Sequence, residues 1–245
     1  MNLIAIDSAC SVLSIAVSRD DEIHYTETEA GSRQSEIAMD CMDSLMKKAS
    51  LKPQELNGIL CMGGPGSFTG LRIGYSIAKG LALSLSIPFV PIPTLDCIAY
   101  QSEGNEEREK KNEKIEIRCE RLTENLVLAV IEARKGAFYY AFFQSGKRLT
   151  PDTDGTTEQI AAAIKEIEKG NNITLTGPAA SLFYDALPPE PRAVLVLDSE
   201  CRGYAKELIL IAKDKNLFDN DNTAYLYSGP EYVRKTDAEL SLLQN

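Results

Sequence analysis

The chain has 245 residues, of which 44% are hydrophobic and 25% are charged, and its formal net charge is −10. This length and composition allow a substantial buried core, in one large domain or in two small ones. The negative charge argues against a protein that grips nucleic acid by itself, because phosphate binding needs clustered Lys and Arg.

Local patterns in the first part of the chain indicate alternating strands and helices. Three short runs rich in Ile, Val and Leu, with turn residues between them, predict an antiparallel meander. Apolar residues at spacings of three and four then predict an amphipathic helix, and prolines in and around Phe89–Ile92 predict an edge strand. In chain order, we expect strands over 2–7, 12–19 and 22–28, a helix over 35–49, a strand over 58–62, a helix over 69–86 and a strand over 89–92.

The loop before the second helix runs from Gly63 to Gly74 and reads Gly-Gly-Pro-Gly-Ser-Phe-Thr-Gly-Leu-Arg-Ile-Gly. Glycines between a strand and a helix permit positive φ and close backbone approach, and the first N–H groups of the helix can face an anion. The loop lacks the Gly-Lys-Ser/Thr of a Walker motif and the G-x-G-x-x-G of a dinucleotide fingerprint. By itself it therefore indicates a tight turn that starts a packed helix.

The helix over 69–86 carries two stripes of different character. Large aliphatic residues recur every four positions and suit a sheet, whereas a parallel line of small residues lets another helix approach closely. The small-residue line allows two interpretations, which are packing against the helix over 35–49 and a surface for another subunit. Met39, Met42 and Met46 would suit such an adaptable surface. The aliphatic stripe is Ile73, Ile77, Leu81 and Leu85, and the small-residue stripe is Gly70, Gly74, Ala78 and Ala82.

Residues 103–121 are dominated by Glu, Lys and Arg, and they predict a charged connector with helical tendency. Beyond it we expect strands over 125–134 and 136–144, a helix over 156–169 capped by Thr157, a strand over 173–176, a helix over 179–187, a strand over 193–197 and a helix over 204–215. The recurrence of strands followed by alternating strands and helices predicts an internally duplicated α/β protein with mixed sheets.

Cysteine and histidine usage limits the possible chemistry. The six cysteines lie far apart without a C-x-x-C pair, which indicates reduced thiols and neither a zinc site nor a disulfide framework. The single histidine, His24, lies in an expected strand between charged residues, so a Ser-His-Asp or Cys-His active site is not expected. Because no apolar run reaches roughly 20 residues and no basic leader is recognisable, we expect a cytoplasmic protein without a membrane segment.

Several segments of the chain resemble one bacterial family. The glycine loop is the most specific of them, and shorter matches are Leu3–Ser8, Cys10–Val12, Ile131–Gly136 and Gly229–Arg234. In these segments the chain is similar to the TsaB family, also called YeaZ, the non-catalytic partner in the complex that makes threonylcarbamoyladenosine in tRNA. The resemblance implies an actin-like ATPase (RNase H-like) fold with two duplicated lobes, of which the second is reduced. The implied division is a first lobe over 1–102, a connector over 103–121, a second lobe over 122–216 and a C-terminal segment over 217–245 that packs back on the first lobe.

The same resemblance implies a function without chemistry of its own. The chain would be required for threonylcarbamoylation of the adenosine next to the anticodon in tRNAs that read ANN codons, as a subunit that binds and activates a TsaD-like transferase together with a TsaE-like ATPase. It would contact tRNA indirectly, would hold no metal or cofactor when isolated, and would form a homodimer through the same helices; ATP or ADP would bind only at the joint with its partners. The implied partner interface comprises Ser35, Met39, Met42, Met46, Phe68, Gly70, Leu71, Arg72, Gly74, Tyr75 and Ala78.

Two enzymatic functions are the alternatives. An actin-like small-molecule kinase or ATPase would work through Asp7 and Glu132, because an acid at a strand end can hold a metal-bound water, although it can also cap a turn. Gly177 lies in a turn where actin-like proteins close on adenosine, but Pro178 and Ala179 follow where a second glycine would ease ligand approach. A peptidase has the least support, because the chain offers only isolated serines and cysteines.

Overall fold

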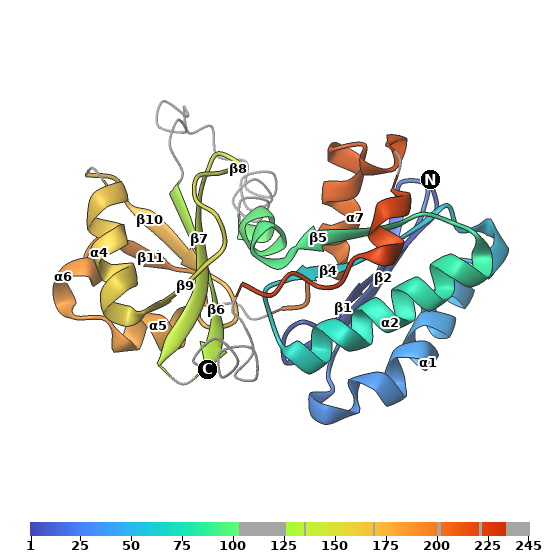
Figure 1. Ribbon diagram of the computed structural model, residues 1–245, viewed down its shortest axis with the longest axis horizontal. Helices are drawn as coiled ribbons and strands as arrows, with labels where there is room; N and C mark the ends of the chain where they lie inside the picture. Colours follow the sequence, from blue (N-terminus) through green and yellow to red (C-terminus); the bar gives the residue numbers. More distant parts are fainter. Residues whose placement is uncertain (103–125, 135, 169, 200–201, 221, 234–245) are drawn as a thin grey trace, which may run out of the picture.

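The computed structural model describes residues 1–102, 126–134, 136–168, 170–199, 202–220 and 222–233. They form two lobes, each built on one mixed sheet, which lie next to each other (Figure 1). The predicted charged connector, 103–121, lies outside the described residues. Among the described helices, none is both long and apolar enough to cross a membrane.

The first sheet has the strand order β3-β2-β1-β4-β5. The predicted meander is confirmed, since β1 pairs antiparallel with β2, and β2 pairs antiparallel with β3, while β1, β4 and β5 run parallel. All residues of β1 and β4 are buried, as is typical of parallel strands covered on both faces. The strands are β1 (Leu3–Asp7), β2 (Val12–Arg19), β3 (Glu22–Glu29), β4 (Gly58–Gly64) and β5 (Phe89–Pro93).

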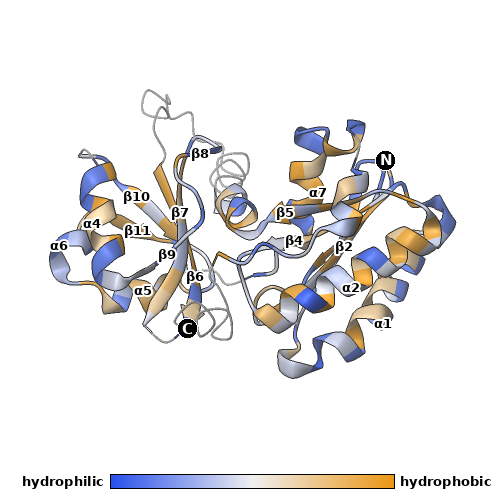
Figure 2. Ribbon diagram, viewed as in Figure 1, coloured by the Kyte–Doolittle hydropathy of each residue, from blue (hydrophilic) through white to orange (hydrophobic). Residues whose placement is uncertain are grey.

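Helices cover both faces of this sheet. On one face lie α1 (Gln34–Lys48), which packs on β2 and β3, and α2 (Phe68–Leu85), which packs on β4. On the other face lie α7 (Ala205–Asp214) and a helical segment over 94–102 that the sequence patterns did not predict. Figure 2 shows hydrophobic residues along the strands and a mixture of hydrophobic and hydrophilic residues along α1 and α2.

The second sheet has the order β11-β10-β6-β7-β8, with β9 also paired to β7. Its antiparallel pair β6–β7 and its parallel strands β6, β10 and β11 repeat the arrangement of the first sheet, so the predicted duplication is confirmed. The second copy is smaller, because α5 has 7 residues where α2 has 18. The elements are β6 (Leu126–Arg134), β7 (Ala137–Gln144), β8 (Lys147–Arg148), β9 (Thr153–Thr156), α4 (Thr157–Ile167), β10 (Ile173–Thr176), α5 (Ala180–Ala186), α6 (Pro189–Arg192) and β11 (Leu195–Leu197).

One predicted detail of α4 is wrong. The N-cap is Thr156 and not Thr157, because the Thr156 hydroxyl accepts a hydrogen bond from Gln159 N while the Gln159 side chain accepts one from Thr156 N. This reciprocal pair is a capping box, which satisfies two N–H groups at the helix start.

The lobes share one hydrophobic cluster. Val127 and Phe143 of the second sheet belong to the same buried cluster as Leu3 of the first sheet and Ile98 of the helical segment over 94–102. At the edge of this contact the Arg148 guanidinium is paired with Asp96 of the first lobe and with Asp152. The two lobes are therefore joined by packed side chains as well as by the chain itself.

The position of α7 differs from the expected division, which gave residues 122–216 to the second lobe. Its buried residues Ala205, Leu208 and Ala212 belong to the cluster that covers Leu3 and Ala5 of β1, so α7 packs on the first sheet. The face of the first sheet opposite α1 and α2 is apolar and needs a cover, which explains this position.

The chain after α7 also follows the first lobe. The elements η3 (Leu217–Asp219) and η4 (Thr223–Tyr227) come first, and the Phe218 ring lies so close to Gly58 that a Cβ atom there would overlap it. Residues 228–233, which we call the strap, then run along α2 and β4: Lys79 Nζ donates to Ser228 O, and Glu231 N donates to Gly63 O at 2.8 Å.

Candidate functional site

The glycine loop joins three separate parts of the chain. Gly64 has φ +113°, and a Cβ atom there would overlap Glu231 O of the strap, so the position requires glycine. A Cβ atom at Gly66 would lie 2.8 Å from Ala9 O in the turn between β1 and β2, and Ser67 N donates to that same oxygen at 2.8 Å. The Ser67 hydroxyl caps α2 by accepting a hydrogen bond from Gly70 N at 3.2 Å.

The small-residue stripe of α2 faces the interior of its own lobe. Ser8 Oγ donates to Gly70 O at 2.8 Å, and a Cβ atom at Gly70 would lie far closer to Ser8 O than the 3.0 Å that real Cβ atoms keep. A Cβ atom at Gly74 would lie 2.9 Å from Ser8 Oγ, and the side chains of Ala78 and Ala82 are fully buried. This stripe therefore packs on the turn after β1 and on β4, inside its own lobe.

Most of the implied partner interface is buried for the same reason. The side chains of Leu71 and Tyr75 lie on the buried side of α2, and those of Met42 and Met46 lie on the buried side of α1. All four belong to the core clusters of the chain. These residues, together with Gly70, Gly74 and Ala78, are covered by the chain's own atoms, and their part in a partner interface stays a prediction. The residues that are exposed are Ser35, Met39, Phe68 and Arg72.

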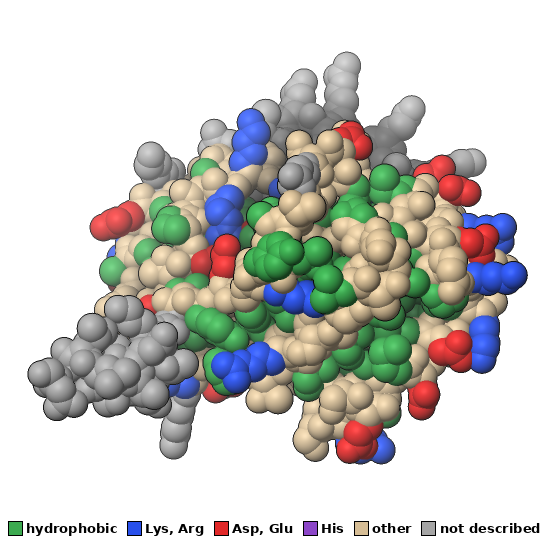
Figure 3. Space-filling model, turned by 45° about the vertical axis from the view of Figure 1, so that its right-hand side comes forward, with side chains coloured by type: hydrophobic (Ala, Val, Ile, Leu, Met, Phe, Trp, Pro, Cys, Tyr) green, Lys and Arg blue, Asp and Glu red, His purple; other side chains and the backbone are tan. Residues whose placement is uncertain are grey.

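Three residues of the aliphatic stripe of α2, which its spacing suited to a sheet, pack half-buried on the core cluster that α1 also covers, and the fourth, Ile73, lines a cavity shared with the second lobe. Five half-buried hydrophobic residues from the two helices pack against one core cluster, and we call them the α1–α2 seam. Figure 3 shows hydrophobic side chains over the middle of the face on which α2 lies, with charged side chains toward its edge. The seam consists of Ile37, Cys41, Ile77, Leu81 and Leu85.

A cavity of about 570 Å³ lies between the lobes. The first lobe contributes the turn Ala9–Ser11 and the start of α2, and the second lobe contributes the end of β6 with Glu132 and the turn with Pro178. Among the described residues that line it, Glu132 is the one acid and none is Lys or Arg.

The predicted pair of acids does not meet in this cavity. Asp7 is fully buried: its Oδ1 accepts a hydrogen bond from Ala9 N and its Oδ2 accepts one from Tyr204 N, each at 3.0 Å. Burial raises the pKa of the Asp7 carboxyl to about 6, against the two hydrogen bonds, which lower it. Asp7 therefore ties the end of β1 to the start of α7, and of these two acids Glu132 is the one that lines the cavity.

Gly177 has a structural role in this region. Its φ is +113°, and a Cβ atom there would overlap Val130 O of β6. The glycine thus permits the end of β10 to lie close to β6, while Pro178 and Ala179 line the cavity. Among the described residues, no group of three or more His, Cys, Asp or Glu could hold a metal ion.

Comparisons with known proteins place the chain. The model of the family described as TsaD, tRNA N6-adenosine threonylcarbamoyltransferase, matches residues 26–150, which is just over half of the chain. The tRNA threonylcarbamoyladenosine biosynthesis protein TsaB of Bacillus subtilis is 26% identical over 253 aligned residues, which cover 100% of this chain and 99% of that protein. The chain belongs to the TsaB (YeaZ) family.

Other relatives agree with this assignment. TsaB of Escherichia coli is 28% identical over 144 residues, which cover 59% of this chain and 55% of that protein. The crystal structure titled YeaZ from Pseudomonas aeruginosa has a TM-score of 0.74 at 19% identity, with 94% of this chain and 99% of that chain covered. At this identity the likeness concerns the fold, and the expected actin-like fold with two mixed sheets is confirmed.

Another Pseudomonas aeruginosa structure, titled an uncharacterized protein with similarity to peptidase YEAZ, has a TM-score of 0.75 at 20% identity and covers 95% of this chain. In this TsaB-family chain His24 pairs with Glu22 on β3, with Nε2 and Oε1 3.2 Å apart.

Proposed function

We propose that the chain is the accessory subunit of a tRNA threonylcarbamoyl transferase complex. In this role it binds and activates a TsaD-like transferase, together with a TsaE-like ATPase, and the adenosine next to the anticodon in tRNAs reading ANN codons is modified by the partner. The chain contributes no catalytic residue and contacts tRNA through its partners, which fits its net charge of −10.

The observation that carries the proposal is the α1–α2 seam. Its five hydrophobic residues are half-buried within the chain, so a helix pair of similar shape could complete their burial and gain apolar contact area. The same surface would serve for a homodimer, in competition with the transferase. The cavity between the lobes adds support, because within the described residues its lining holds no cationic side chain of the kind that phosphoryl-transfer enzymes use.

The direct test is transfer of the threonylcarbamoyl group to tRNA by the TsaD-like and TsaE-like proteins with the adenylate donor, in the presence and absence of this chain. We expect transfer to depend on the chain. Equal transfer without it would contradict the proposal and would return attention to ligands of the cavity near Glu132.

A variant locates the surface within this assay. Gly80 lies on the exposed side of α2 next to Leu81, and nothing lies within 4 Å of a Cβ atom placed there, so Gly80→Arg should fold while blocking the seam. The matched control is Ala162→Arg, which adds the same side chain to an exposed position of α4 in the second lobe. We expect loss of association for the first variant and normal association for the second.

A further inference from the structure

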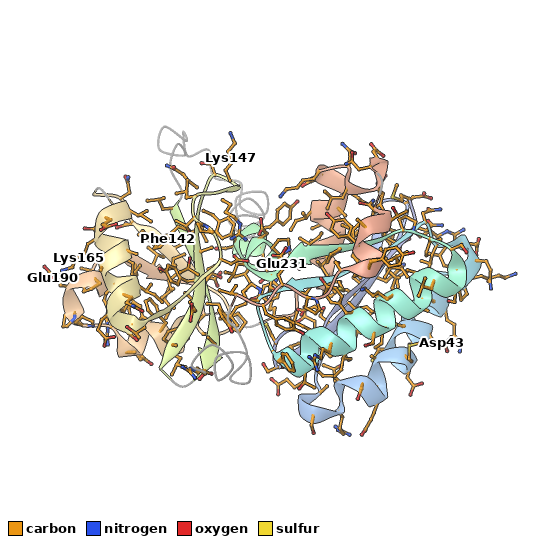
Figure 4. All side chains as sticks on the ribbon, in the orientation of Figure 1. Asp43, Phe142, Lys147, Lys165, Glu190 and Glu231 are labelled. Atoms are coloured by element: carbon orange, nitrogen blue, oxygen red, sulfur yellow. The ribbon has the colours of Figure 1, made fainter. Side chains whose placement is uncertain are left out.

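A second cavity, of about 470 Å³, lies on the first lobe, apart from the cavity between the lobes. The edge strand β3 contributes Tyr25–Glu27, and the chain at the start of α7 contributes Arg202, Lys206 and Glu207. The cavity therefore opens between the edge of the sheet and a helix that covers the sheet. In Figure 4 α7 lies on the side of the first lobe away from Asp43 of α1, so this cavity is not part of the face formed by α1 and α2.

The lining of this cavity carries charges of both signs. Arg202 and Lys206 are cations, and Glu27 and Glu207 are acids. Lys206 Nζ lies 5.5 Å from the centroid of the Tyr25 ring, so this cation reaches across from α7 to β3. Among the described lining residues Glu207 is the buried one, only 5% exposed, and it marks the inner side of the cavity. Opposite charges attract more strongly at such a place than in open water, because the effective dielectric constant is lower.

The start of α7 is fixed on the sheet before any ligand binds. A Cβ atom at Gly203 would lie 2.0 Å from Ser14 Cβ of β2, so the chain passes too close to the sheet for any other residue. The next residue is also held, because Tyr204 N donates to Asp7 Oδ2 at 3.0 Å. The charged residues of the cavity are therefore carried by backbone segments that are already joined, which lowers the entropy lost in binding a ligand.

The two acids of the cavity act on a third acid behind them. Burial is the main cause of the raised pKa of the Asp7 carboxyl, and the charges of Glu207 and Glu27 raise this pKa further. Three acids from three elements thus lie close enough to repel one another. A positively charged group of a ligand would reduce this repulsion. Within the described residues no group of three or more His, Cys, Asp or Glu could hold a metal ion, so an organic cation is indicated.

The cations of the cavity add a second condition. A ligand with only positive charge would be repelled by Arg202 and Lys206, and a ligand with only negative charge would be repelled by the two acids. A small molecule that carries both charges can place each beside its opposite. Free amino acids combine an ammonium group and a carboxylate on one carbon atom, and an Arg guanidinium can hold such a carboxylate in a bidentate pair.

We propose that this cavity binds a free α-amino acid, with its ammonium group facing the two acids and its carboxylate facing the two cations. The neutral polar residues Thr26 and Gln101 line the same cavity and can form hydrogen bonds with the side chain of the ligand. The site belongs to the isolated chain, so it goes beyond the proposed function and does not depend on the partner proteins.

The test is binding of L-glutamine to the full chain, measured by ligand-detected NMR and by the change in Tm. Two analogues each lack one charge: glutaramate lacks the ammonium group, and 4-aminobutanamide lacks the carboxylate. We expect L-glutamine to bind and to raise Tm, because a ligand of the folded chain stabilises it. Each analogue should bind about 10- to 100-fold more weakly, which is typical for the loss of one charge-assisted hydrogen bond.

Variants locate the ligand in this cavity. Glu207→Gln and Lys206→Met each remove one charge at nearly constant size, and each should weaken binding by about 10-fold or more. Because Glu207 is buried, Glu27→Gln makes the same test at an exposed position where folding is not at risk. The matched control is Lys213→Met, on the same helix, whose Nζ lies 3.7 Å from Asp21 Oδ1 at another cavity. This variant should bind like the unmodified chain.

Several results would overturn the proposal. One is that L-glutamine does not bind the unmodified chain at millimolar concentration. Another is that glutaramate or 4-aminobutanamide binds as tightly as L-glutamine, which would indicate a site for simple anions or simple cations. A third is unchanged binding in both Glu27→Gln and Lys206→Met, which would place the ligand elsewhere. All of these measurements use the isolated chain, so their outcome is separate from that of the transfer assay for the proposed function.

Discussion

The two glycines Gly70 and Gly80 of α2 should respond in opposite ways to replacement by alanine. At Gly70 the new Cβ atom would overlap the Ser8 carbonyl oxygen and would lie 3.0 Å from the Ser8 carbonyl carbon and 3.2 Å from Ser67 Cβ. The backbone at Ser8 cannot easily retreat, because Ser8 Oγ is bonded to Gly70 O at 2.8 Å. At Gly80 the new methyl group would meet nothing within 4 Å.

The magnitudes follow from overpacking and helix propensity. Overpacking of this kind lowers the free energy of unfolding by about 1–3 kcal/mol. Within a helix, alanine raises it by up to ~1 kcal/mol relative to glycine. We therefore expect Gly70→Ala to lower the free energy of unfolding by about 2 kcal/mol, a fall in Tm of about 4–8 °C for a chain of this size. Gly80→Ala should raise the free energy of unfolding by up to about 1 kcal/mol.

The assay is urea or thermal unfolding of the isolated chain, without partner proteins. The prediction concerns the isolated chain because the structure places the small-residue stripe inside its own lobe. A Gly70→Ala protein as stable as Gly80→Ala, but defective in association, would refute this reasoning and would return the stripe to a partner surface.

Two further predictions concern buried and capping groups. Burial raises the pKa of Asp7 from its ordinary value of 3.8 to about 6 in the folded state. The protonated carboxyl therefore stabilises the fold fully below about pH 4, and this stabilisation is lost as the pH rises through 6. The loss amounts to about 3 kcal/mol of the free energy of unfolding. Asp7→Asn cannot titrate, so its free energy of unfolding, measured from pH 4 to 6, should fall less with rising pH than that of the unmodified chain; an identical slope would contradict the role of Asp7. Thr156→Ala should lower the free energy of unfolding by about 1 kcal/mol, because it removes the N-cap of α4. Thr157→Ala is the control and should change the free energy of unfolding much less. Equal effects of the two substitutions would argue against the capping box.

The elements of the fold could be predicted from the sequence because their signals are local. The meander β1–β2–β3 and the helices α1 and α2 follow from hydrophobic period and turn residues, and their limits agree with the expectations to within two residues. The helical segment over 94–102 and the short strands β8 and β9 were not predicted. Local patterns also gave no information on which sheet α7 would cover, because its apolar face suits either one.

The orientation of α2 could not be predicted, because both of its stripes are apolar enough to face a sheet. What decides between them is the turn after β1, whose residue Ser8 lies 62 positions before Gly70 and approaches α2 so closely that only small residues fit. Ile77 and Leu81 are then left half-buried, against the core cluster that α1 also covers. Asp7 poses the same difficulty, since its second oxygen is bonded to Tyr204 N, 197 positions away.

The glycine loop explains why a surface rather than a cleft is the more informative feature of this chain. Its glycines are required by backbone atoms of Ser8, Ala9 and Glu231, so its tight turns fix the start of α2 against the β1–β2 turn and the strap. The parts of α2 that this arrangement leaves outward are the half-buried residues Ile77, Leu81 and Leu85 and the exposed side chains of Phe68 and Arg72. Both lie on a helix whose N-terminus is held by several hydrogen bonds, and a rigid element of this kind presents its side chains to a partner with little loss of entropy on binding.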